Sequence, residues 1–70
     1  MVKELSARNH LEGEVTDVDI GVVGAKIKID TGANKVTAFI TKEGAEELDI
    51  KEGDDVKAVI KATEVMVSKS

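Results

Sequence analysis

A chain of 70 residues with no proline, no cysteine and one aromatic side chain has room for one small hydrophobic core. We therefore expect a single domain over residues 1–70, with an ordered core from residue 5 to residue 67. The formal net charge of −4 argues against nonspecific nucleic-acid binding, which depends on Lys and Arg neutralising phosphates. The lack of a bilayer-length apolar run and of a signal-peptide core predicts a cytoplasmic protein with no membrane partner.

The apolar residues predict a mainly β fold. Ten valines and six isoleucines favour the pleated, half-buried surface of a sheet. A core of small aliphatic side chains, with Phe39 as its one bulky filler, buries little area per residue. Since the chain has no cysteine for a disulfide and no Cys/His cluster for a structural zinc, we expect oligomerisation to stabilise it.

The first predicted strand runs from Leu11 to Ile20. Apolar residues alternate with polar ones as far as Thr16, after which the apolar phase slips by one residue and resumes at Val18. A slip of one residue in a two-residue period is typical of a β-bulge, which we place near Asp17.

The next two strands form a predicted hairpin. From Val23 to Asp30 apolar and polar residues alternate, which predicts a strand buried on one face. Residues 31–34 have the composition of a tight turn, because Gly32 and an asparagine tolerate positive φ. Alternation resumes from Lys35 to Thr41, so the two strands should pair.

One short helix is expected between Thr41 and Ile50, before the last strand. Thr41 is a suitable N-cap, and the acidic residue Glu43 follows in the first turn. Gly44 weakens this helix by up to about 1 kcal/mol relative to alanine. After a turn at residues 51–54, alternation predicts a last strand from Asp55 to Thr63 that continues in phase to Val67.

Four or five strands with one helix before the last strand predict a small, partly open β-barrel of the OB type. A one-sheet α+β arrangement is the alternative. The end of the last strand is apolar on both faces, which indicates cover from both sides. In so short a chain, we expect a neighbouring subunit to supply part of this cover.

Catalytic and metal-binding residues are sparse, and we predict no enzyme, no directly coordinated metal cation and no cofactor. Ser6 and His10 could form a nucleophile–base pair, but no orienting acid accompanies them. Asp17 and Asp19 imitate the start of a calcium loop, yet lysines occupy the positions where further carboxylates would be needed.

Two segments without Asp or Glu combine a cation with a hydroxyl group: residues 6–9, with sequence SARN, and residues 60–63, with sequence IKAT. A doubly charged tetrahedral oxyanion carries only acceptor oxygens and needs such donors. The alternative is structural: Ser6 and Asn9 would cap local backbone groups, and Lys61 would be a solvated strand residue.

The sequence resembles the Mop family, or molbindins, which are small molybdate-binding proteins. The resemblance covers residues 5–67 and rests on four stretches of sequence: SARNHLEGEV, GVVGAKI, KVTAFIT and EELDIKEGDDVKAVIKATEVMV. It implies an OB-like barrel subunit in a hexamer, a trimer of dimers, that binds molybdate or tungstate between subunits. The implied role is intracellular storage, buffering or homeostasis of the oxyanion.

The resemblance also implies a set of site residues. Ser6, Ala7 and Arg8 would supply hydroxyl and backbone donors from one subunit, while Asn9 braces the segment. A neighbouring subunit would close the site with three further residues, Lys61, Ala62 and Thr63. In relatives, serine can stand where Ala62 or Thr63 stands.

A second resemblance gives an alternative function. Residues 48–56 are similar to the strand–turn segment of swapped-hairpin transcription factors of the antitoxin type, which bind DNA as dimers. Those proteins carry clustered basic residues, whereas this chain has a single arginine and a negative net charge. We therefore expect no nucleic-acid partner.

Overall fold

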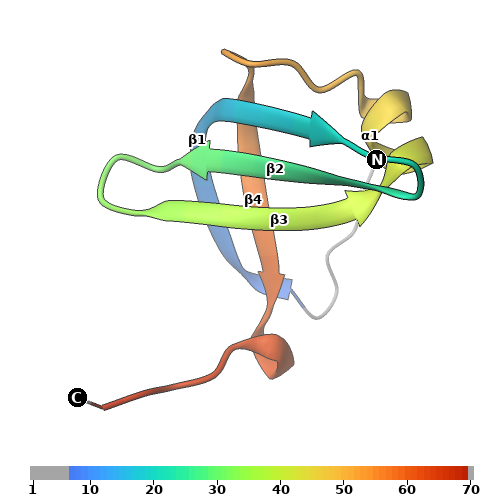
Figure 1. The fold of residues 1–70 in the computed structure, drawn as a ribbon. Helices are drawn as coiled ribbons and strands as arrows, with labels where there is room; N and C mark the ends of the chain where they lie inside the picture. The colour runs from blue at the N-terminus through green and yellow to red at the C-terminus, as the bar shows by residue number, and fades with distance from the viewer. Residues whose placement is uncertain (1–6, 70) are drawn as a thin grey trace.

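The protein is described here by a computed structural model, which covers the backbone of residues 7–69 and the side chains of residues 9–69. Its elements, in chain order, are β1 (Ala7–Ile20), β2 (Gly24–Asp30), β3 (Lys35–Thr41), α1 (Lys42–Leu48), β4 (Asp55–Lys61) and the 3-10 turn η1 (Ala62–Glu64). The strands form one antiparallel sheet in the order β3-β2-β1-β4. This sheet curls so that β4 runs across the direction of β2 and β3 (Figure 1). The prediction of a mainly β, partly open barrel with one short helix is confirmed.

Strand β1 holds the half-barrel together because it pairs with two different strands. From Ala7 to Glu14 it pairs with β4, and from Glu14 to Ile20 it pairs with β2. The register with β2 shifts between Val15 and Asp17, which confirms the predicted bulge and leaves Thr16 as the extra residue.

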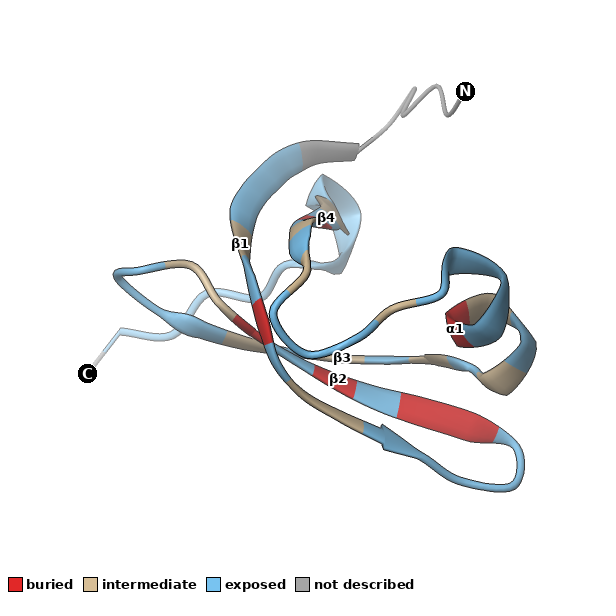
Figure 2. Ribbon diagram, turned by 90° about the horizontal axis from the view of Figure 1, so that it is seen from above, coloured by how far each residue is buried: buried red, intermediate tan, exposed pale blue. Residues whose placement is uncertain are grey.

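The core is small and lies where β1 crosses β2. Figure 2 shows the buried residues along β2, at this crossing and on the inner face of α1. The buried hydrophobic residues are Val15, Ala25, Ile27, Ile29, Ala45 and Ala58.

Two residues expected in the core lie outside it. The Phe39 side chain is 72% exposed and covers Gly24, where a Cβ would lie 2.3 Å from the phenyl Cζ. Phe39 faces away from the core because its neighbours on β3, Ala38 and Ile40, already take the core-facing positions. Val23 is 79% exposed because β2 begins one residue later, at Gly24.

Helix α1 begins as predicted, at the cap residue Thr41. The Thr41 Oγ1 accepts a hydrogen bond from the Gly44 backbone N–H at 3.0 Å. The helix buries Ala45 and ends at Asp49, which has a left-handed φ of 54°. No helix in residues 7–69 combines the length and apolar character needed to cross a membrane.

The last strand is shorter than predicted. It ends at Lys61, which lies opposite Ala7 of β1. The backbone turns into η1 instead, and the segment from Val65 onward leads away from the sheet (Figure 1). The side chains of Met66 and Val67 are each 93% exposed.

Candidate functional site

The two acid-free donor segments lie beside each other at one end of the β1–β4 ladder. Ala7 on β1 lies directly opposite Lys61 on β4, although 54 positions separate them in the sequence (61 − 7). Ala62 and Thr63 follow Lys61 directly and form the start of η1. Of the predicted site residues, Ser6 lies outside the described part of the chain, as do the side chains of Ala7 and Arg8.

A second bulge, which no pattern in the sequence predicted, lies within the SARN segment. Ala7 pairs with Lys61 and Asn9 pairs with Ile60, so β1 advances two residues while β4 advances one. Arg8 is therefore the extra residue of a β-bulge. The predicted strand began at Leu11 and did not include this segment; β1 begins four residues earlier because β4 supplies a partner there.

Asn9 makes the side-chain contact that joins the two segments. Its Nδ2 donates a hydrogen bond to the Ile60 backbone carbonyl at 3.3 Å. The side chains of Lys61, Ala62 and Thr63 are all exposed. The Lys61 ammonium and the Thr63 hydroxyl are therefore accessible to a ligand at this end of the ladder.

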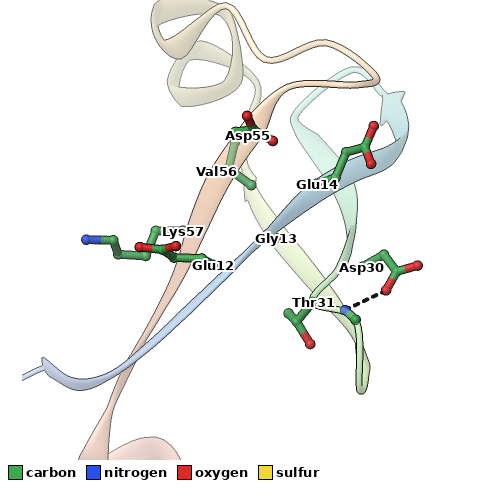
Figure 3. Close-up of a pocket in the computed structure, with 9 residues that line it drawn as sticks. Glu12, Gly13, Glu14, Asp30, Thr31, Asp55, Val56 and Lys57 are labelled. Atoms are coloured by element: carbon green, nitrogen blue, oxygen red, sulfur yellow. Dashed lines mark hydrogen bonds between the residues drawn. The ribbon is translucent and has the colours of Figure 1, made fainter.

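Charge is distributed unevenly along the β1–β4 ladder. Residues 7–11 and 58–63, which form the donor end, contain no acidic residue. The other end borders a hollow of about 790 Å³ (Figure 3). Four of the residues that line this hollow are acidic: Glu12, Glu14, Asp30 and Asp55. An anion is repelled from the acidic end, so the donor end is where this ladder can accept one.

Strand β1 carries three residues that were considered above for a metal site or for catalysis: Asp17, Asp19 and His10. Asp17 lies opposite Lys28 and Asp19 lies opposite Lys26, so both carboxylates face lysines across the β1–β2 ladder. Among residues 7–69, no three or more His, Cys, Asp or Glu side chains are arranged to hold a metal ion. His10 pairs with Val59 in the β1–β4 ladder.

Comparison with known proteins identifies the family. The TOBE domain model matches residues 5–67. Molybdenum-pterin-binding protein 1 of Clostridium pasteurianum is 44% identical over 64 residues, which cover 90% of this chain and 94% of the relative. The structure of a molybdate-binding protein from Sporomusa ovata has a TM-score of 0.89 and 40% identity, covering 96% of this chain and all of that one.

A third protein, the cytoplasmic molybdate-binding protein ModG in its molybdate-bound form, has a TM-score of 0.77 and 41% identity. It matches over 83% of this chain and 42% of its own length. The likeness therefore covers sequence and backbone over nearly the whole chain, and it includes both donor segments. The chain belongs to the TOBE-domain family and is a homologue of the Mop molybdenum-pterin-binding proteins.

Proposed function

We propose that this protein binds molybdate or tungstate, as free tetrahedral oxyanions, at sites shared between subunits. The observation that carries oxyanion binding is the pairing of Ala7 with Lys61, at an acid-free end of the sheet. The sharing of the site between subunits follows from the resemblance to the Mop family. The names of its relatives support molybdate as the ligand. Storage, buffering or homeostasis in the cytoplasm is the role that fits binding without chemical conversion.

The donors match the chemistry of the ligand. Arg8 and Lys61 supply positive charge, and Ser6 and Thr63 supply hydroxyl groups, together with backbone N–H groups. Hydrogen bonds assisted by charge are roughly twice as strong as neutral ones. Because monohydrogen phosphate carries a proton, a site made only of donors disfavours it, whereas molybdate is fully deprotonated at neutral pH. Discrimination against the smaller sulfate ion depends on the size of the site.

Exposed apolar surface supports assembly of the chain into a homo-oligomer. A hollow of about 520 Å³ lies between β3 and β4, on the open side of the half-barrel. Its apolar lining residues are Ile27, Ile29, Ala38, Ile40, Leu48, Ile50, Val56, Ala58 and Val59. The exposed segment at Val65–Val67 adds further apolar surface that one chain leaves uncovered. We expect a hexamer, a trimer of dimers, of about 44 kDa, six times the 7.4 kDa chain.

Isothermal titration of the anion-free protein with molybdate tests the proposed function, with tungstate, sulfate and phosphate as comparisons. Arg8→Glu and Lys61→Glu should each abolish binding, with the far-UV circular dichroism spectrum unchanged. Lys57→Glu is the matched control, because Lys57 lies on the same face of β4 and the variant has the same net charge. Failure of wild-type protein to bind molybdate, or unchanged affinity in both site variants, would refute the proposal.

A further inference from the structure

Three exposed apolar side chains gather beside the loop that joins β1 to β2. Val22 is 90% exposed, and Val23 and Phe39 are also largely open to solvent. All three line one hollow of about 190 Å³, together with the glycines at either end of the loop and the opposed pair Asp19 and Lys26. We call Val22, Val23 and Phe39 the Phe39 patch.

The Phe39 patch is held in a fixed shape by backbone contacts. The phenyl ring lies against Gly24, and this close approach is open only to a residue without a Cβ. The Gly21 N–H donates to the Gly24 carbonyl at 2.7 Å, which closes the loop. The Val23 carbonyl accepts a hydrogen bond from the Lys42 N–H at 3.2 Å, at the start of α1. An apolar surface that is already ordered loses little conformational entropy when a partner covers it.

The Phe39 patch and the apolar hollow of about 520 Å³ lie on opposite faces of the β2–β3 hairpin. Ala38 and Ile40 line that larger hollow, and successive side chains of a strand point to opposite faces. Phe39 stands between them on β3 and therefore points away from the hollow. A partner subunit that fills the hollow lies on the other side of the sheet, so the patch needs a cover of its own.

A hexamer built from dimers requires two different contacts on every subunit. A contact in which both subunits use the same surface saturates at a dimer, so a second surface must join the dimers to one another. The charges beside the patch suit a second copy, because Asp19 and Lys26 put both signs side by side and each copy brings both. A membrane surface favours an excess of positive charge, whereas Asp17 and Asp19 on β1 balance Lys26 and Lys28 on β2.

We propose that the Phe39 patch is the contact that joins dimers into the hexamer, with a second copy of this chain as its occupant. This inference rests on the assembly that forms part of the proposed function. It divides the two apolar surfaces between the two contacts: the larger hollow serves within a dimer, and the Phe39 patch serves between dimers. Without the patch, assembly stops at the dimer.

Phe39→Glu tests the patch, and Thr37→Glu is its matched control. Thr37 lies on the same exposed face of β3, and both variants add one negative charge. Each new glutamate lies opposite a lysine of β2, Lys26 for position 39 and Lys28 for position 37. The molar mass in light scattering should fall from about 44 kDa to about 15 kDa, twice the 7.4 kDa chain, in Phe39→Glu and should stay at about 44 kDa in Thr37→Glu.

Val22→Glu tests the same patch from the loop. Because the Val22 side chain is 90% exposed, its replacement does not disturb the core of the chain. This variant should also stop at about 15 kDa, the mass of two chains. The far-UV circular dichroism spectra of all three variants should match that of the wild type.

A mass near 44 kDa in both patch variants overturns the proposal and leaves the patch to another protein or to a membrane. An equal loss of mass in Thr37→Glu, or a fall of the patch variants to monomers, also overturns it, because the effect would then not be confined to the joining of dimers through the patch. A wild-type protein no larger than a dimer overturns it as well. Titration of the wild type with molybdate is read separately: a hexamer that binds no molybdate overturns the proposed function and leaves this contact in place.

Discussion

Gly13 precedes Glu14, the residue at which β1 passes from one partner strand to the other, and Gly13→Ala probes this crossing. A Cβ on Gly13 would lie 2.6 Å from the Asp30 carbonyl oxygen and 2.7 Å from the Ile29 Cγ2. Real Cβ atoms essentially never approach heavy atoms within 3.0 Å, so the first separation must grow by at least 3.0 − 2.6 = 0.4 Å. The obstacle is backbone, and β1 must therefore move away from β2.

Overpacking of this kind costs about 1–3 kcal/mol. In a domain of this size 1 kcal/mol corresponds to roughly 4–8 °C, so Gly13→Ala should melt about 10 °C below wild type. The variant should also bind molybdate more weakly, because the displaced strand carries the SARN segment.

Gly21→Ala is the matched control, since its Cβ would meet only the Gly24 carbonyl oxygen at an ordinary 3.5 Å. Thermal unfolding by circular dichroism, at one fixed protein concentration, measures both variants, because assembly makes the melting temperature depend on concentration. If Gly13→Ala melts within about 2 °C of Gly21→Ala, the close approach at the crossing does not constrain the fold.

Three further predictions concern the helix cap, the C-terminal segment and pH. Thr41→Ala removes the N-cap and should lower the free energy of unfolding by about 1 kcal/mol, measured by urea denaturation. The double variant Met66→Ser/Val67→Ser should leave the fold of the chain intact, because both side chains are 93% exposed, and should weaken assembly in light scattering. An unchanged molar mass of the double variant in light scattering would exclude this segment from the interface between subunits. Hydrogen bonding to the Asp49 carboxylate, and then its charge, raise the pKa of Lys51. The ion pair between Lys51 and Asp49 therefore contributes a small stabilisation below the ordinary lysine pKa. This stabilisation is lost as the pH rises through the raised pKa of Lys51. Urea midpoints of wild type and Lys51→Ala should converge at that alkaline pH.

Local patterns predicted most of the secondary structure. Alternation predicted the observed limits of β3, and the phase slip placed a bulge near Asp17, one residue from the extra residue Thr16. The cap at Thr41 followed from its hydroxyl group and position. In each case the determining interaction is between neighbours in sequence or on adjacent strands.

Other features depended on contacts between distant residues. Residues 7–10 show no alternation of their own and join β1 because they pair with β4. The contact of Phe39 with Gly24 depends on the pairing of β2 with β3. The resemblance named the donor residues, whereas the bulge at Arg8 that offsets them required the register of the ladder.

The central claim is an oxyanion site that takes Arg8 from one subunit and Lys61 from another. Within one chain these segments are also neighbours, through Ala7 and Lys61, so a site within a single chain is the competing arrangement. Mixing the two variants Arg8→Glu and Lys61→Glu separates these arrangements. The decisive measurement is the molybdate bound per chain after the two are unfolded and reassembled together.

Each variant alone should bind no molybdate. In randomly mixed oligomers, a shared site receives an intact Arg8 in half of the cases and an intact Lys61 in half, so about a quarter of the sites should recover. Recovery of that fraction is the result that the shared site predicts. Absence of recovery in oligomers shown to be mixed would contradict it, because a site within one chain is defective in every subunit.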